Sequence, residues 1–161
     1  MKCYVTNNSP YARKVRVVAF EKGLYDEVEW ETITREERGD IQDFNPLGKV
    51  PVAILDTGDL VCDSPVICAY VDSLTSSRDL IPKSKPKRWQ VLTLEALGDG
   101  LGEAVIAVSQ ESQRSNEKRS QDVVDRQTGK IKSALSVLDD AAGDFNDPPL
   151  MGEIAVACAL D

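Results

Sequence analysis

Apolar positions recur with two different periods in the first part of the chain, and both are needed to predict its fold. Residues 2–6 alternate as a short strand does, whereas residues 10–22 repeat apolar positions every three or four residues, as an amphipathic helix does. Alternation returns at 27–32, and residues 51–62 have the composition of a β-hairpin. Residues 64–74 predict a second amphipathic helix. The predicted order is β-α-β, a connector, and then β-β-α.

The two predicted helices begin in the same way, with a serine followed at once by a proline. Ser9 and Ser64 stand where a helix N-cap is expected, while Pro10 and Pro65 suit the first helical position, where the missing N–H costs nothing. Gly23 is expected to end the first helix. A hydroxyl at a helix N-terminus can also stabilise a bound anion. Capping and anion binding therefore both remain open for each serine.

The second part of the chain has a helical period throughout. One helix is predicted at about 86–111 and another at about 117–140, and residues 153–160 are apolar on every side, as in a buried helix. A polar, proline-bearing stretch at 76–88 predicts a linker. Three glycines in the first of these helices suggest a kink or a close contact between helices: Gly98, Gly100 and Gly102.

The fold class expected from these patterns is therefore mixed α/β followed by all-α. The N-terminal domain is predicted to span residues 1–76, and the helical C-terminal domain residues 86–161, with the latter incomplete at its end. A polar, weakly helical connector is predicted at 35–44. Its charged run, 36–43, lacks the ligand spacing of calcium loops and is interpreted as a solvated loop or short helix.

Charge and composition exclude several classes of function. The chain has 161 residues, a net charge of -8 and no basic block, which argues against nucleic-acid binding and against an anionic membrane surface. No leader sequence and no apolar run long enough to span a membrane are recognised, so a cytoplasmic location is expected. Histidine is absent, which excludes Ser-His-Asp and Cys-His catalysis and removes the commonest zinc ligand. We expect no metal site.

The cysteines have no metal-binding or redox spacing. None of the four forms a C-x-x-C pair, and free cysteine is usually a small buried apolar residue. All four are therefore predicted to be buried: Cys3, Cys62, Cys68 and Cys158.

Several blocks of the sequence, in this order, resemble the bacterial cytosolic glutathione S-transferases. They are SPYARKVRV, NPLGKVPVAILDTGDLVCDSPVICAYVDSL, RWQVLTLEALGDG, RQTGKI and GEIAVACAL. The resemblance implies a thioredoxin-like N-terminal domain that binds glutathione as co-substrate, a helical-bundle C-terminal domain and a homodimer. It also implies transferase activity of the detoxification type on a small hydrophobic electrophile.

The resemblance places the glutathione site on the N-terminal domain. Val50 and Pro51 match the family's Val-Pro pair, which implies a cis peptide bond and a Val50 backbone that pairs with the cysteinyl unit of glutathione. Asp63 and Ser64 match the clamp for the γ-glutamyl end, in which the carboxylate suits the ammonium group and the helix N-terminus suits the α-carboxylate. Lys49 is a further candidate, for the glycyl carboxylate.

Ser9 falls where related transferases carry their catalytic residue. We expect it to stabilise the glutathione thiolate by a hydrogen bond instead of acting as a nucleophile. Serine instead of cysteine at this position argues against mixed-disulfide chemistry. Asn7 and Asn8 are the alternatives for this role, together with a backbone amide. Tyr11 is a candidate for the electrophile pocket, although such a residue is as well explained by core packing.

The sequence departs from the family pattern near its end. The family usually has a Ser or Thr cap three residues before an Asp, where this chain has Leu150 and Glu153. Loss of the hydroxyl predicts a weaker last helix, by roughly 1 kcal/mol. The helices that normally follow are not recognised. Two functions are therefore carried forward: a glutathione transferase, and a non-catalytic binding or partner-interaction module with the same fold.

Overall fold

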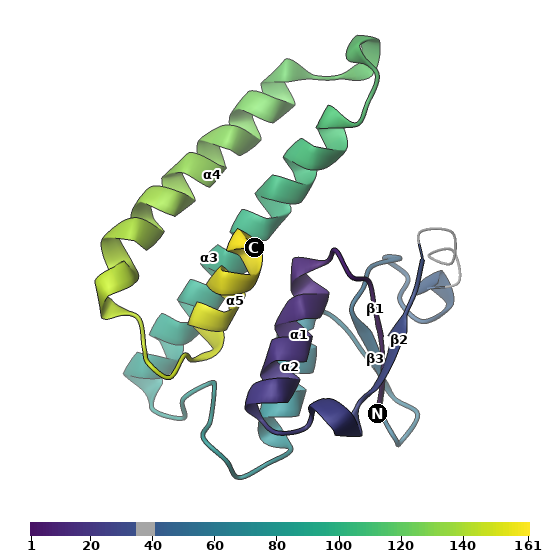
Figure 1. Cartoon of the computed structure of the whole chain (residues 1–161), viewed down its shortest axis with the longest axis vertical. Coiled ribbons are helices and arrows are strands. Elements are labelled where there is room, and N and C mark those ends of the chain that lie inside the picture. Colours follow the sequence, from purple (N-terminus) through teal and green to yellow (C-terminus); the bar gives the residue numbers. More distant parts are fainter. Residues whose placement is uncertain (35–40) are drawn as a thin grey trace. The chain divides into compact units, whose positions relative to one another are not determined.

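A mixed sheet of four strands forms in the first of two compact units, Met1–Arg88, within the part of the chain described by the computed structural model, residues 1–34 and 41–161 (Figure 1). The strands, in the order in which they lie side by side, are β2 (Glu29–Thr32), β1 (Lys2–Val5), β3 (Val52–Ile54) and β4 (Leu60–Val61). β1 is parallel to β2 and antiparallel to β3, and β3 is antiparallel to β4. The predicted element order is confirmed.

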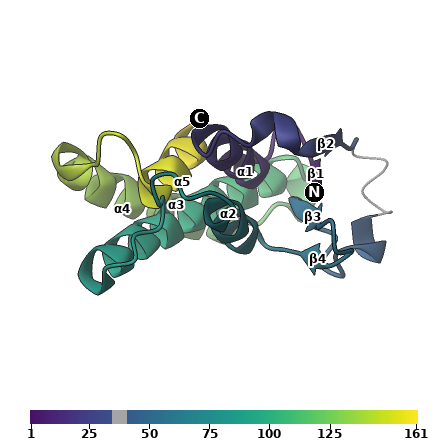
Figure 2. The same cartoon turned by 90° about the horizontal axis from the view of Figure 1, so that it is seen from below.

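Two helices, α1 (Pro10–Glu21) and α2 (Ser64–Ser73), pack against one another on one side of this sheet (Figure 2). The alternation of β1 explains which side chains they cover, because Cys3 and Val5 are fully buried while Lys2 and Tyr4 are only partly buried. On the opposite face of the sheet the ring of Tyr4 stacks on that of Phe44. Both rings pack against a small apolar cluster formed by Ile33, Ile41 and Val52.

The starts and ends of these elements differ from the sequence-based expectation by one or two residues. Asp63, not Ser64, is the N-cap of α2, and its side chain accepts a hydrogen bond from the Ser64 N–H. The prediction was wrong here because aspartate caps as well as serine does and Pro65 fits the second helical position too. The expected strand at 27–32 begins only at Glu29, after a 3₁₀ turn at Tyr25–Glu27. Gly23, with φ +70°, follows α1 as expected.

One charged side chain of α1 is buried together with the apolar ones. Lys14 is only 1% exposed, although lysines of an amphipathic helix usually lie on its solvent face. Val15, Val18 and Ala19 are buried, whereas Tyr11 is half-buried. The long aliphatic stem of lysine can fill apolar space, so helical period alone could not assign Lys14 to a face.

The second unit, Trp89–Asp161, is helical. α3 (Lys85–Ser112) runs alongside α4 (Gln121–Ala141), and the short helix α5 (Met151–Leu160) packs against α3 (Figure 1). The expected helices at 86–111 and 117–140 are therefore present, but α4 begins after a separate 3₁₀ turn, Asn116–Lys118. Residues 35–40, which include most of the expected connector and its charged run, lie outside the described residues.

Backbone contact brings α3 and α5 together at two glycines. A Cβ added at Gly98 would lie 2.8 Å from the Ala155 carbonyl carbon, and one added at Gly152 would lie 2.8 Å from the Val91 carbonyl oxygen. A close helix contact was one of the two expectations for the glycines of α3, and it is confirmed at Gly98. Gly100 instead faces open space, with nothing within 4 Å of such a Cβ.

The start of α5 keeps the acidic half of a capping arrangement. Leu150 is the N-cap residue, and its backbone N–H donates to Glu153 Oε2 over 3.0 Å. Glu153 Oε1 also accepts bonds from the backbone and side chain of Asn146. Burial acts to raise the pKa of Glu153, but these hydrogen bonds outweigh burial and lower it.

The lowered pKa of Glu153 predicts a pH-dependent contribution to stability. A depressed carboxylate pKa stabilises the fold above the unfolded-state pKa, and this stability is lost as pH falls through the folded-state pKa. We expect Glu153→Gln to cost about 1 kcal/mol or more at pH 7 in urea denaturation, and clearly less at acid pH. The matched control is Glu103→Gln, at an exposed position of α3. Equal losses for Glu153→Gln at both pH values would contradict the prediction.

Candidate functional site

Three loops of the first unit meet at a single edge of the sheet. Because β1 and β4 both run antiparallel to β3, the carboxyl ends of β1 and β4 lie at the same edge as the amino end of β3. The register agrees, since Tyr4 pairs with Val52 and Val61 pairs with Ala53. The loops that leave this edge, together with the first residue of α2, contain all the predicted glutathione-site residues: Ser9, Lys49, Val50, Pro51, Asp63 and Ser64.

Ser9 caps α1 at this edge. Its Oγ accepts a hydrogen bond of 3.2 Å from the Ala12 N–H, and its backbone is extended, as is usual for an N-cap. A serine hydroxyl has two acceptor lone pairs and one proton to donate, so the cap leaves the donor function intact. The two roles left open by the sequence are therefore compatible in one residue.

Ser64 is the most unusual polar residue of the site. It is fully buried at the start of α2, and its Oγ has no hydrogen-bond partner within residues 1–34 and 41–161. A buried hydroxyl without a partner costs about 1–3 kcal/mol, so a ligand that supplies the missing bond gains that much. Asp63 beside it is exposed, and its Oδ1 accepts from the Ser64 N–H.

The loop before β3 is fixed by a residue that sequence analysis did not single out. Asn45 is only 3% exposed; its Nδ2 donates to the Lys49 carbonyl over 2.9 Å, and its Oδ1 accepts from the Leu47 N–H over 3.0 Å. The Val50–Pro51 peptide bond that follows is cis, as expected. The Lys49 side chain is exposed. An Asn-Pro pair shortly before a glycine was the available signal for such a turn.

A second residue missed by sequence analysis lies at the end of β1. Thr6 is 8% exposed, and no hydrogen-bond partner for its Oγ1 occurs in the described part of the chain. Nothing in the sequence distinguishes it from an ordinary turn threonine. Asn7 and Asn8, the alternatives to Ser9, are exposed in the same loop.

Three of the four cysteines are buried. Burial raises the pKa of the Cys3 thiol to about 12, which makes it unreactive. Cys68 and Cys158 are buried as predicted, but Cys62 is exposed, so the prediction was wrong for that residue. It precedes the N-cap of α2, where the chain turns at the surface instead of entering the core.

The helical unit has a hollow of its own. It has a volume of about 590 Å³, lies between α4 and α5, and is lined mainly by apolar side chains: Leu135, Leu138, Phe145, Val156 and Leu160. In the range that the structure covers, no cluster of Cys, Asp or Glu is placed to hold a metal ion. No helix among the same residues is long and apolar enough to cross a membrane.

Comparison with known proteins agrees with this architecture. Residues 8–74 match the family model described as glutathione S-transferase, N-terminal domain. An uncharacterised transferase-like protein of Escherichia coli K12, YibF, is 32% identical over 163 residues, which cover 99% of this chain and 80% of YibF.

Solved structures give the same result. A Methylobacillus flagellatus glutathione S-transferase with bound glutathione superposes with a TM-score of 0.93 at 35% identity, covering 99% of this chain and 80% of that one. A Pseudomonas fluorescens Pf-5 family member with bound glutathione gives 0.89 at 34% identity, with the same coverage. The fold is thus a thioredoxin-like domain followed by a helical domain. With these relatives, the chain belongs to the glutathione S-transferase family.

Proposed function

We propose that this chain binds glutathione at the sheet edge described above and activates its thiol for attack on a hydrophobic electrophile. The observation that carries the proposal is the buried, unpartnered Ser64 hydroxyl at the start of α2, on the same sheet edge as Ser9 at the start of α1. Crystallised relatives at 34–35% identity hold glutathione, which supports the choice of ligand.

The residues of the edge match the charges of the tripeptide. The Ser64 hydroxyl and the positive end of the α2 dipole suit the γ-glutamyl carboxylate, and the exposed Asp63 carboxylate suits the ammonium group. The Val50 backbone pairs with the cysteinyl unit, and Lys49 approaches the glycyl carboxylate. This arrangement directs the sulfur toward the first turn of α1, where Ser9 lies.

Ser9 lowers the thiol pKa by stabilising the thiolate. A free thiol with a pKa near 8.5 is only a few per cent ionised at neutral pH, and lowering it by about two units needs about 2.7 kcal/mol. A hydrogen bond to a charged group contributes about 1.5–3 kcal/mol, and a helix N-terminus about 0.3–2 kcal/mol. Together they contribute about 2–5 kcal/mol, a range that includes the required 2.7 kcal/mol, so the proposal needs no general base. The thiol proton passes to solvent, the thiolate forms an S–C bond with the electrophile, and the electron pair of the bond that breaks departs with the leaving group. Tyr11 in the first turn of α1 lines the electrophile side.

Calorimetric titration with glutathione tests the binding step. We expect binding by the unmodified chain and an affinity roughly tenfold weaker for Ser64→Ala, because the ligand then loses one hydrogen bond to a charged group. Ser73→Ala is the matched control, since this serine lies at the other end of α2 and its hydroxyl bonds to the Tyr70 carbonyl. The absence of any binding heat at about 1 mM glutathione would contradict the proposal.

Two further measurements complete the proposal. Glutathione binding without turnover of any electrophile would favour the alternative, a non-catalytic binding module. A homodimer, implied by the family resemblance, is checked by light scattering of the purified chain.

A further inference from the structure

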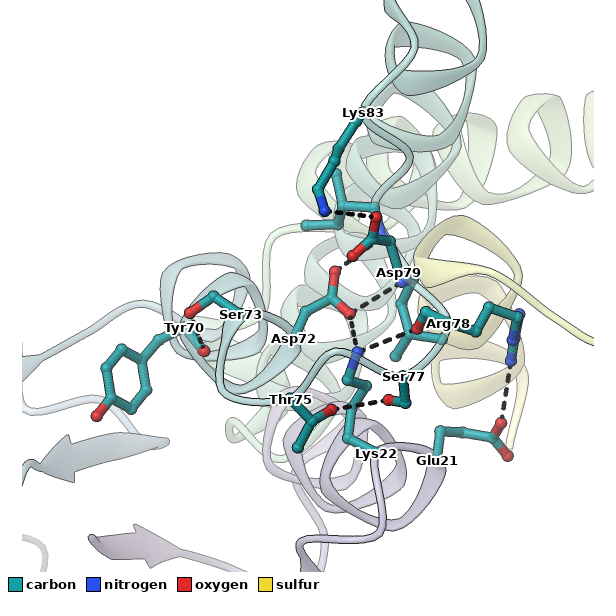
Figure 3. Close-up of polar contacts among 12 residues, drawn as sticks. Glu21, Lys22, Tyr70, Asp72, Ser73, Thr75, Ser77, Arg78, Asp79 and Lys83 are labelled. Carbon is teal, nitrogen blue, oxygen red and sulfur yellow. Dashed lines mark hydrogen bonds and ion pairs between the residues drawn. The ribbon is translucent and has the colours of Figure 1, made fainter.

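The connecting segment 76–84 is attached to the first unit by one buried carboxylate. Asp72, in the last turn of α2, lies 3.0 Å from the ammonium group of Lys22, the residue that ends α1 (Figure 3). The side chains of Lys22 and Asp72 are 0% and 8% exposed. This ion pair therefore joins the carboxyl ends of both helices, away from the sheet edge that holds the candidate site.

Both oxygens of Asp72 also hold the connecting segment. Oδ1 accepts from the Leu80 N–H and Oδ2 from the Ile81 N–H, each over 2.9 Å. Lys22 Nζ donates to the Arg78 carbonyl over 3.0 Å, so both members of the pair bind the same short stretch of backbone (Figure 3). Leu80 and Ile81 are 1% and 8% exposed. Part of the polar stretch predicted to be a linker, 76–88, thus contributes apolar side chains to the core.

The surrounding ion pairs are of a different kind. Arg78 pairs with Glu21 over 3.2 Å and Lys83 pairs with Asp79 over 3.2 Å, and all four side chains are at least partly exposed. Exposed pairs contribute little, whereas removing one member of a buried pair leaves an uncompensated charge and is strongly destabilising. Among the ion pairs that hold the segment, the one between Lys22 and Asp72 therefore contributes most.

We propose that residues 76–84 form a strap that Lys22 and Asp72 hold closed, and that this strap opens as one unit while the sheet stays folded. Its hydrogen bonds at Leu80 and Ile81 end on a single carboxylate and belong to no helix or strand, so loss of that carboxylate frees them together. Closed, the strap leaves only residues 82–84 between Ile81 and α3. Open, it lengthens the free chain between α2 and α3. The proposal is independent of the glutathione site.

Hydrogen exchange of the full chain, followed residue by residue with NMR, tests the strap. In the unmodified protein the Leu80 and Ile81 amides are expected to have the same protection factor, because one opening exposes both. This protection factor is expected to be lower than those of the amides paired between β1 and β3. Asp72→Asn is expected to speed exchange at both amides on the order of a hundredfold, with little change in the sheet. Asp79→Asn is the matched control in the same segment, because it removes only an exposed pair.

A double variant separates the pair from general weakening. Lys22→Met in the Asp72→Asn background removes the unpaired ammonium group, so exchange at Leu80 and Ile81 is expected to slow relative to Asp72→Asn alone. Should Asp72→Asn fail to fold, hydrogen exchange of the unmodified protein still tests the proposal. Protection factors of Leu80 and Ile81 as high as those of the β1–β3 amides would overturn the proposal. Equal changes in these protection factors in Asp72→Asn and Asp79→Asn would overturn it as well.

Discussion

Replacing Ser9 by alanine is expected to raise the thiol pKa of bound glutathione by about one to two units. The reason is loss of a hydrogen bond to the thiolate, about 1.5–3 kcal/mol, at 1.36 kcal/mol per unit. At neutral pH the thiolate fraction then falls from about three-quarters to between about a quarter and a few per cent, so the rate of conjugation is expected to fall roughly threefold to 25-fold. The thiolate's ultraviolet absorbance, titrated against pH in the bound state, measures the shift directly.

Two further variants separate this role from capping of α1. Ser9→Thr keeps both the donor and the acceptor, and is expected to behave nearly as the unmodified chain does. Ser9→Asp keeps the acceptor for the Ala12 N–H, and so preserves the stability of α1, but it has no proton to donate and adds a like charge near the sulfur. We expect Ser9→Asp to raise the thiol pKa at least as far as Ser9→Ala does.

An unchanged thiol pKa in Ser9→Ala would limit the residue to capping. Its loss would then appear only as a destabilisation of about 0.5–2 kcal/mol. Thiolate stabilisation would pass to Asn7, Asn8 or a backbone amide of the same loop. In the proposed site, glutathione binding depends on the other end, at Ser64, and its calorimetric test is independent of this one.

The element order could be predicted from sequence because each signal was local. Alternation in β1, helical period in α1, and the Ser-Pro and Asp-Ser-Pro starts are set by neighbouring residues. Where two neighbours could both satisfy the same requirement, as Asp63 and Ser64 could for capping, local rules placed the cap one residue too late. The family resemblance then supplied candidate site residues, and for Ser9 and Ser64 it favoured ligand contact where local rules left both capping and anion binding open.

Contacts between distant residues could not be predicted in this way. Asp72 meets Lys22 and the Leu80 amide only because α1 and α2 end side by side, and nothing in a polar linker indicates that two of its N–H groups bind one carboxylate. The role of Asn45 could not be predicted for a related reason, because the sequence around a buried asparagine that holds a turn is the same as around a solvent-exposed one. The missing partner of Ser64 is visible only when all its neighbours are placed.

Gly98→Ala is expected to destabilise the helical unit, although alanine is the better helix former. The added Cβ would lie 2.8 Å from both the Ala155 carbonyl carbon and the Val156 nitrogen. These are backbone atoms of α5, so no side-chain rotation relieves the contact and the two helices must separate. Overpacking of this kind costs about 1–3 kcal/mol, against a gain of at most about 1 kcal/mol in helix propensity. Gly98→Val is expected to cost more.

Gly100→Ala provides the matched control two residues along the same helix. Nothing lies within 4 Å of its added Cβ, so the propensity gain is unopposed and stability is expected to rise by up to about 1 kcal/mol. Urea denaturation of the full chain, followed by circular dichroism, compares the two variants. Opposite signs are expected because the same substitution meets α5 backbone at one position and solvent at the other. Equal midpoints for both variants would show that α3 and α5 are not in backbone contact at Gly98.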